Sequence, residues 1–211
     1  MRAIGLVASK GGTGKSTLAI HLAVLAGQAG LKVALIDLDP QRSAGDWWRA
    51  RQAATPVLVE TGARQLRQVL AAARRDGLEL AVLDAPPHAD ADAAAAAAVA
   101  DLVLIPTRPG VLDLRAVART VASVKAAGRR AAFVLNACPP PGRTGDVGIV
   151  REAREALAAY GLPVAPVAIS QRAALSHALI DGRAVSEFEP AGKAAAELLA
   201  LWQWARKELK A

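Results

Sequence analysis

The chain has 211 residues, of which 53% are hydrophobic and 21% are charged. This length suits one domain with a large core, so we expect a single domain over 1–211. The one cysteine, Cys138, excludes an intrachain disulfide framework. No apolar stretch reaches the roughly 18 residues of a membrane-spanning helix, and no leader-like segment precedes the first apolar run. We therefore expect a cytoplasmic protein.

Short apolar runs typical of strands alternate with stretches of helical spacing along the chain. This alternation predicts an α/β fold of three layers, in which a mostly parallel, twisted sheet carries helices on both faces. Ligands of such sheets bind at the carboxyl ends of the strands. The expected strands cover 3–8, 33–37, 57–60, 79–84, 102–106, 131–136 and 164–168.

The first strand leads into a glycine-rich loop, 9–17, which reads SKGGTGKST, and helical spacing follows. Strand, loop and helix in this order are typical of a phosphate loop. Its glycines let backbone N–H groups turn toward an anion, and the helix N-terminus adds its positive end. Lys15 can reach the β and γ phosphates of a nucleotide, and the Ser16 hydroxyl can hold Mg²⁺.

Carboxylates follow two of the later expected strands. Asp37 and Asp39 stand at and just beyond the end of 33–37, and Asp84 ends 79–84. Cleavage of a triphosphate needs a metal to offset charge and a group that positions the attacking water. A strand-terminal aspartate can instead cap the next helix, and that alternative stays open for each residue taken alone.

The loop departs from the common pattern G-x-x-x-x-G-K-[ST], because Ser9 replaces the first glycine and Lys10 follows it. This form resembles the deviant Walker A loop of the ParA/MinD family of ATPases. Three further segments are similar to that family: VALIDLDPQ (33–41), LAVLDAPP (80–87) and the stretch 171–197, which resembles the closing segment of short ParA proteins. The resemblance implies a P-loop NTPase fold with ATP and Mg²⁺ as cofactors.

The resemblance also implies roles for individual residues. Lys10 would cross a dimer interface to the partner's phosphates, so that ATP holds two subunits together. The alternative is that Lys10 only adds positive charge to its own site. Lys10, Lys15 and Asp39 would be the catalytic residues, with Asp39 orienting or activating water. Mg²⁺ would be held by Ser16, Asp37 and Asp84. The nucleotide phosphates would be bound by the whole loop segment, namely Lys10, Gly11, Gly12, Thr13, Gly14, Lys15, Ser16 and Thr17.

The adenine pocket is expected where 131–136 ends and where PVAISQR (166–172) closes over the base. Asn136 resembles the family's adenine-contacting asparagine, although an asparagine that opens a turn is the structural alternative. Backbone contacts from Val167 and Ala168 are expected by the same resemblance. The segment 107–114 resembles one that flanks the phosphates, and its prolines suit an ordinary turn equally well.

The surface charge points to a polyanion. Lysine and arginine number 26 against 19 acidic residues, which gives a net charge of +7. Such a balance favours sequence-independent binding to DNA phosphates, and a dimer would double it. Each basic residue alone is more often part of a solvated helix face. The candidate contacts are Arg143, Arg151, Arg154, Arg172, Arg183, Lys193, Arg206, Lys207 and Lys210.

The C-terminal stretch 194–209 allows two interpretations. Leu198, Leu201, Trp202, Ala205 and Leu209 form an apolar helical stripe with basic residues beside it. MinD-type relatives attach to membranes by such a tail, but a last helix packed on the sheet has the same pattern. Packing is the favoured interpretation, because no linker separates this helix from the family-like segment. Membrane association is therefore not expected.

The favoured function is a ParA-like ATPase that forms an ATP-dependent homodimer, binds nonspecific DNA at the nucleoid and partitions a plasmid or positions another cargo. A ParB-like or other partner protein would stimulate hydrolysis. A nitrogenase-type reductase is disfavoured, because its interface cluster takes two cysteines per subunit. A ligase of the dethiobiotin synthetase or cobyrinic amidase class remains an alternative, and it would need a dedicated carboxylic-acid pocket.

Overall fold

A computed structural model of the protein describes residues 1–87, 91–142, 145 and 147–210. Over these residues the chain forms a six-stranded sheet in the order β3-β2-β4-β1-β5-β6, and every neighbouring pair is parallel. This confirms the α/β fold class expected from the sequence. The strands are β1 (Arg2–Leu6), β2 (Val33–Asp37), β3 (Val57–Glu60), β4 (Leu80–Asp84), β5 (Leu102–Thr107) and β6 (Ala131–Leu135).

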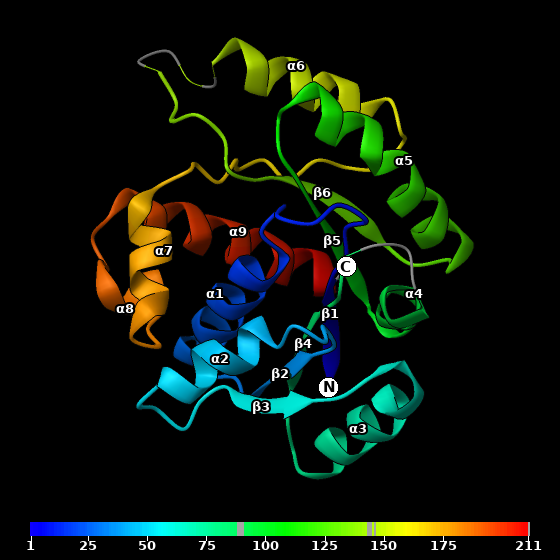
Figure 1. The fold of residues 1–211 in the computed structure, drawn as a ribbon, viewed down its shortest axis with the longest axis vertical. Helices are drawn as coiled ribbons and strands as arrows, with labels where there is room; N and C mark the ends of the chain where they lie inside the picture. The colour runs from blue at the N-terminus through cyan, green and yellow to red at the C-terminus, as the bar shows by residue number, and fades with distance from the viewer. Residues whose placement is uncertain (88–90, 143–144, 146, 211) are drawn as a thin grey trace.

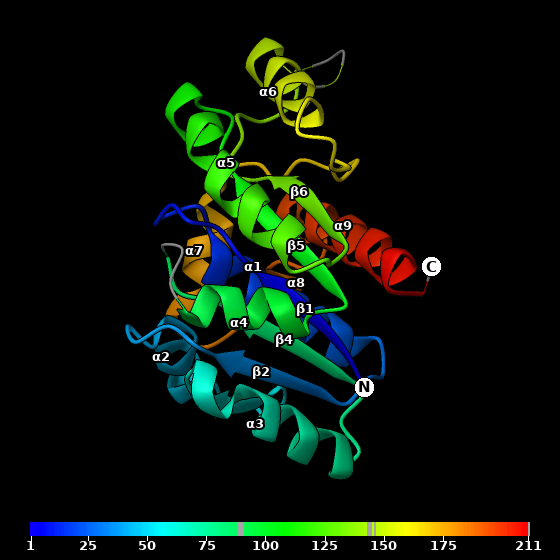
Figure 2. The same ribbon diagram turned by 90° about the vertical axis from the view of Figure 1, so that its right-hand side faces the viewer.

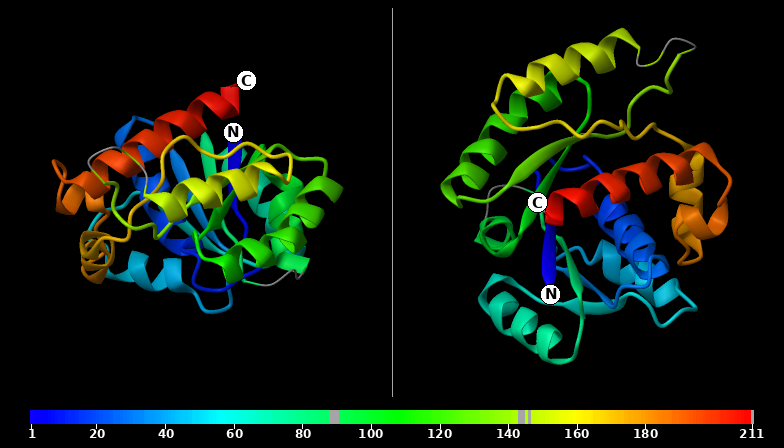
Figure 3. Two further views of the ribbon diagram at one scale, coloured as in Figure 1. Left: turned by 90° about the horizontal axis from the view of Figure 1, so that it is seen from above. Right: turned by 180° about the vertical axis from the view of Figure 1, so that it is seen from behind.

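Helices cover both faces of the sheet, so that the molecule has three layers (Figures 1, 2 and 3). One face carries α1 (Lys15–Gln28), α2 (Ser43–Ala50), α7 (Ala173–Ile180), α8 (Val185–Phe188) and α9 (Lys193–Lys210). The other carries α3 (Ala63–Arg75), α4 (Ala91–Val99), α5 (Val111–Ala126) and α6 (Gly148–Ala158).

Alternation along the strands divides the core into two halves. In β4, Leu80 and Val82 pack with the α1 and α9 layer, whereas Ala81 and Leu83 pack with the α3 to α6 layer. Successive side chains of a strand point to opposite faces, so a strand buried on both sides reads as an unbroken apolar run. This is why the inner strands were recognisable from the sequence.

The expected strand 164–168 is wrong. Instead of a ladder, the segment forms one isolated bridge with β6, between Val164 and Phe133, and a second bridge joins Ser170 to Cys138 just beyond β6. The N–H groups of Ala165 and Ile169 donate to the carbonyls of Phe133 and Leu135, so four residues of the segment span two residues of β6. Pro166 lies inside this detour and has no N–H to donate, which prevents a regular ladder.

The apolar stripe of the C-terminal helix is buried. Leu198, Leu201, Trp202 and Ala205 are at most 2% exposed and belong to the same core half as α1. The view from behind in Figure 3 shows α9, in red, lying across the sheet beside α1. No helix in the described part of the chain is long and apolar enough to cross a membrane. The stripe therefore serves packing, as the sequence analysis favoured.

Candidate functional site

The phosphate loop connects β1 to α1 at the carboxyl edge of the sheet. Gly12 and Gly14 have φ angles of 71° and 94°, in the left-handed region that a residue with a Cβ rarely adopts. A Cβ on Gly14 would also collide with the side-chain amide of Asn136. Helix α1 begins at Lys15, directly after this glycine. The loop thus brings a helix N-terminus to the site, the arrangement that suits an anionic phosphate.

The two residues that make the loop unusual both contact α5. The N–H of Ser9 donates to Thr120 Oγ1 at 3.0 Å, and its hydroxyl donates to the carbonyl of Ala116 and accepts the Thr120 hydroxyl, both at 3.1 Å. The Lys10 ammonium lies 3.0 Å from Asp113 Oδ2 in the first turn of α5. Because Lys10 is 40% exposed at its side chain, it lies at the rim of the site.

A cavity of about 430 Å³ opens beside the loop, a volume typical of small-molecule sites. Its lining includes eight of the residues named individually for nucleotide binding or catalysis, and it also includes residues that were not named for those roles. The first group is Gly11, Gly12, Gly14, Lys15, Ser16, Thr17, Asp39 and Asn136; the second is Gln41, Ser43, Pro87, Arg108, Ala137, Ser170, Gln171, Arg172, Leu175 and Ser176.

The charged centre of this cavity is Lys15, which is only 6% exposed. Burial lowers the pKa of its ammonium, and the carboxylates of Asp84 and Asp39 oppose that shift. Asp39 is itself 8% exposed, lines the cavity and accepts the N–H of Gln41 at 2.9 Å. A lysine and an aspartate therefore face one cavity from two different loops, one after β1 and one after β2.

Asp84 lies beneath the cavity at the end of β4. Its side chain is fully buried, and neither carboxylate oxygen has a hydrogen-bond partner among the described residues. Burial raises the pKa of this carboxyl to about 7, while the nearby Ser16 hydroxyl and the Lys15 ammonium partly offset the shift. A buried carboxyl without partners is costly unless a cation or a proton compensates it.

Asp84 and Ser16 fit a magnesium site of the nucleotide type. Mg²⁺ in such sites takes one or two protein oxygens and completes its shell with water and substrate phosphates. The described residues contain no group of three or more His, Cys, Asp or Glu side chains that could hold a metal by themselves. When bound, the ion would offset phosphate charge, and Ser16 and Asp84 would be the residues that hold it.

Asp37 is placed differently from Asp84, although the two residues are direct neighbours across β2 and β4. Its Oδ1 accepts the N–H of Asp39 at 3.0 Å, and its Oδ2 accepts the N–H of Gly45 in the first turn of α2 at 3.0 Å. Burial raises the pKa of this carboxyl, and the two backbone N–H groups counter that shift. Both oxygens of Asp37 thus already accept backbone N–H groups, one of them in the first turn of α2, whereas those of Asp84 accept none among the described residues. The expected place of Asp37 in the metal shell therefore stays a prediction.

The cavity is also lined by Asn136, just after β6, and by residues of the segment 170–176. Asn136 Nδ2 donates to the carbonyl of Thr13 at 2.7 Å, so this residue also braces the loop. The structure does not bring Val167 and Ala168 to the cavity, because each packs against a different half of the core. Ser170, Gln171 and Arg172, which follow them, line the cavity instead.

Arg108 is the clearest functional candidate that the sequence analysis left unassigned. It lies between β5 and α5, is exposed and lines the cavity, and its guanidinium faces Gly12. Its position after an apolar strand, in the segment thought to flank the phosphates, was the available signal. A second cation at the phosphate end would add to the charge of Lys15.

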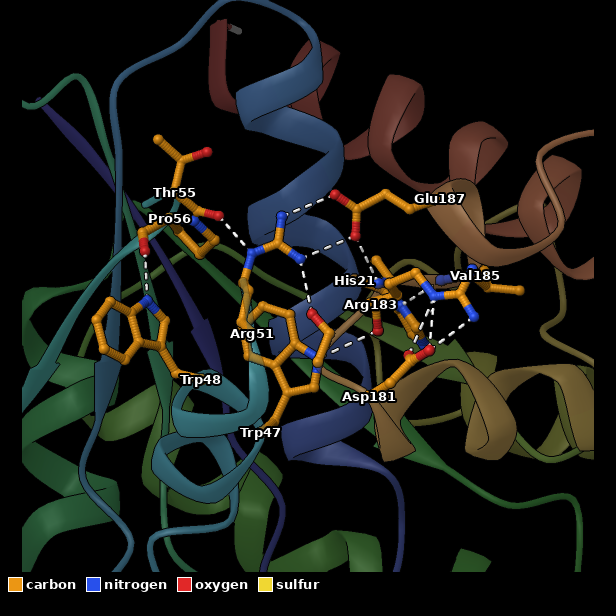
Figure 4. Close-up of polar contacts among 12 residues, drawn as sticks. His21, Trp47, Trp48, Arg51, Thr55, Pro56, Asp181, Arg183, Val185 and Glu187 are labelled. Carbon is orange, nitrogen blue, oxygen red and sulfur yellow. Dashed lines mark hydrogen bonds and ion pairs between the residues drawn. The ribbon is translucent and has the colours of Figure 1, made fainter. Parts of the chain in front are cut away.

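A polar cluster connects the segment 181–187, which includes the start of α8, to the end of α2 (Figure 4). The Arg51 guanidinium forms an ion pair with Glu187 of α8 at 2.7 Å and also donates to the carbonyls of Gly182 and Thr55. On α1, His21 is fully buried and its Nδ1 accepts the N–H of Val185 at 3.3 Å. The cluster therefore joins α1, α2 and α8 beneath the site.

The basic residues considered for DNA fall into three groups. Arg143 lies outside the described residues. Three others have contacts within the chain: Arg154 donates to the carbonyl of Ala165, Arg172 pairs with Glu197, and Arg183 pairs with Asp181. The rest are exposed on α6 and α9, namely Arg151, Lys193, Arg206, Lys207 and Lys210.

Helix α3 is a further basic surface that the sequence analysis did not consider. It has four arginines, no acidic residue, and lies beside the β3 edge of the sheet, at the opposite end of the molecule from α6 (Figures 1 and 2). Its exposed cationic side chains are Arg64, Arg67, Arg74 and Arg75.

Comparison with known proteins decides the family. The family description of the CobQ/CobB/MinD/ParA nucleotide binding domain matches residues 4–185, which is most of the chain and includes the whole phosphate loop. The chain belongs to this family. This membership agrees with the resemblance found in the phosphate loop and in the segments 33–41, 80–87 and 171–197.

One curated relative matches almost end to end. It is the maintenance of carboxysome distribution protein A of Gloeobacter kilaueensis, which is 32% identical over 99% of this chain and 94% of its own length.

Among solved structures, an ATP complex of a McdA variant from Cyanothece has a TM-score of 0.78 and covers 100% of this chain and 96% of its own, at 17% identity. The cobyrinic acid a,c-diamide synthase of Mycobacterium smegmatis, with bound ADP and magnesium, also reaches 0.78 at 16% identity over 100% and 96%. These two structures show the fold, and they do not separate a positioning ATPase from a ligase.

Proposed function

We propose that this family member is a ParA-like ATPase whose ATP-bound dimer binds DNA and positions a cargo. It hydrolyses ATP to ADP and phosphate with Mg²⁺. The observation that carries the proposal is that the two lysines of one loop differ in burial. Lys15 is buried against Asp84 and Asp39, where a triphosphate would lie, whereas Lys10 is at the exposed rim.

Different residues of the proposed ATP site bind the phosphates, the metal ion and the attacking water. The loop N–H groups and Lys15 bind the phosphates, Ser16 and Asp84 hold the ion, and Asp39 orients the attacking water. Asp39 suits that role because it lines the cavity, in contrast to the capping Asp37. A relative named for carboxysome distribution supports a cargo-positioning function over a ligase, which would need a further substrate pocket.

Dimerisation rests on Lys10. At the rim of its own cavity, this lysine has an exposed side chain that a second subunit could approach. In a face-to-face dimer it would contribute positive charge to the partner's phosphates, in the manner of an arginine finger supplied in trans. Hydrolysis would remove the charge it contacts and release the subunits. A partner protein of the ParB type would stimulate this step.

The output is binding to nonspecific DNA at the nucleoid. The exposed cations of α9 and α6 provide the charge, and a dimer presents two such surfaces. ATP therefore controls DNA affinity by controlling the oligomeric state. Plasmid partition and the spacing of a protein cargo would both use this cycle, and the carboxysome-associated relative favours a protein cargo.

The test is DNA retention with and without ATP at two salt concentrations, combined with ATP turnover. Wild-type protein should shift nonspecific duplex DNA only with ATP and Mg²⁺, and the shift should weaken as salt rises. Lys15→Ala should lose ATP binding, and Lys10→Ala should bind ATP but leave DNA unshifted. Turnover that ignores DNA and rises with a small carboxylic acid would instead indicate a ligase.

A further inference from the structure

Residues 170–172 line the cavity and are called the wall below; they are held in place by one carboxylate from a distant helix. Glu197 of α9 accepts the N–H of Ser170 at 2.9 Å and the Ser170 hydroxyl at 2.9 Å. It also accepts Nε and one terminal nitrogen of Arg172, at 3.3 and 2.7 Å. Four donors, two from Ser170 and two from Arg172, thus converge on one side chain.

The wall also has backbone contacts with the residues just after β6. Within the wall, the N–H of Gln171 donates to the carbonyl of Cys138, and the segment before it is the irregular detour at Pro166. Ser170 is 2% exposed, and Glu197 is 15% exposed at its side chain. A hydrogen bond to a charged group that is shielded from water is stronger than a neutral one at the surface. Glu197 is therefore in a position to set the conformation of the wall.

The chemistry of the wall indicates what part of a ligand it meets. Glu197 neutralises the Arg172 guanidinium, so this end of the cavity offers hydroxyls, an amide and Leu175 rather than an unpaired cation. Such a mixture suits a neutral heterocycle and sugar, whereas the phosphate loop suits the anionic end. A nucleotide with its phosphates on the loop would place its base and ribose against Ser170, Gln171 and Leu175.

We propose that Glu197 is a positioning residue that holds the wall 170–172 against the base end of the bound nucleotide. This inference rests on the proposed ATP binding at the same site. Its consequence is a base-dependent contribution to affinity that acts through Ser170 and Arg172, while the phosphate loop binds independently of it. Because α9 also has exposed basic side chains, the same contact joins the base end to the surface proposed for DNA.

The experiment compares ATP with inorganic tripolyphosphate, which has the phosphates but no base or ribose. Glu197→Gln replaces an acceptor by a donor that faces the Ser170 N–H or the Arg172 guanidinium. We expect it to weaken ATP binding about tenfold in calorimetry and to leave tripolyphosphate binding unchanged. The KM for ATP should rise with kcat nearly constant. Glu208→Gln is the matched control, because Glu208 lies on the same helix in an exposed pair with Arg130.

Ser170→Ala provides a second, milder variant if Glu197→Gln unfolds. It removes the hydroxyl that donates to Glu197 and accepts from Arg172, and it keeps the Ser170 N–H and the Arg172 guanidinium on Glu197. It should weaken ATP about twofold to threefold, again without an effect on tripolyphosphate. Equal weakening of both ligands, or unchanged ATP binding in folded Glu197→Gln protein, would overturn the positioning role while leaving the ATPase intact. Wild-type protein that binds tripolyphosphate and not ATP would overturn the proposed function as well.

Discussion

The two ends of the nucleotide cavity are built in opposite ways. The phosphate end comes from one contiguous segment, 9–17, whose shape is fixed by glycines and a helix start. The base end is assembled from residues far apart in the chain, with Asn136, the wall 170–172 and Glu197 brought together by packing. Anion binding needs local backbone geometry, whereas the wall depends on the tertiary fold.

The sharpest way to break this comparison is at Gly14. We expect Gly14→Ala to weaken ATP binding by at least about 100-fold, because a Cβ is strained at φ 94° and collides with Asn136. Since Asn136 belongs to the base end, this variant disturbs both ends at their point of contact. Calorimetric titration with ATP measures the loss.

Gly27→Ala is the matched control on the same helix. A Cβ at Gly27 meets open space, and alanine is the better helix former, so this variant should bind ATP normally and gain about 1 kcal/mol of stability. Normal ATP affinity in folded Gly14→Ala protein would show that the loop tolerates a side chain there, contrary to the geometry.

A second, smaller effect concerns His21, which belongs to the polar cluster that joins α1, α2 and α8. Burial lowers the pKa of His21 to about 4, from its ordinary 6.5, so the unfolded chain takes up the proton first as pH falls. The stability that neutral His21 contributes is present above pH 6.5 and is lost between pH 6.5 and 4, by about 3 kcal/mol in total. His21→Gln should flatten this part of the profile in chemical unfolding measured from pH 4 to 8.

The exposed His177 on α7 provides the comparison for that profile. His177→Gln should keep the acid-dependent loss of the wild-type protein. The same slope in His21→Gln would mean that another group causes the loss.

The smallest expected effect is at the rim. Asp113→Asn removes the ion pair that holds Lys10 within its own chain. Because the pair is partly exposed, its loss should change ATP affinity less than about twofold and favour the ATP-dependent dimer by up to about fivefold. Sedimentation over a concentration series measures this. The control is Asp181→Asn, which breaks an exposed ion pair with Arg183 and should leave dimerisation unchanged. A weaker dimer in Asp113→Asn would contradict the proposed role of the Lys10 to Asp113 contact.

The contrast between the two ends also explains what the sequence could predict. The loop and strands β2 and β3 were predictable because each is a local pattern of glycines or apolar residues. The segment 166–172 was expected at the base and includes the wall, but the individual contacts were assigned to Val167 and Ala168, which do not line the cavity. The difference arises because the detour at Pro166 depends on how the segment lies against β6. Glu197 looks like any charged residue on an amphipathic helix until Ser170, 27 residues earlier, is brought beside it.

The acidic residues show the same limit. Asp37 and Asp84 both end apolar strands, and no local pattern tells a cap from a metal ligand. The difference comes from α2, whose first turn gives Asp37 a backbone partner, while Asp84 is left without one among the described residues. Similarly, Ser9 was visible only as a departure from a pattern. Its contacts with α5 show why the loop can use a serine there.

The central claim is that ATP joins two subunits through Lys10. Light scattering after size-exclusion chromatography tests it most directly, with Asp39→Ala used to prevent hydrolysis. We predict a dimer for Asp39→Ala in ATP and Mg²⁺, a monomer in ADP, and a monomer in both nucleotides for the double variant Lys10→Ala/Asp39→Ala. A monomeric Asp39→Ala protein with ATP bound, or a double variant that still dimerises, would contradict the claim.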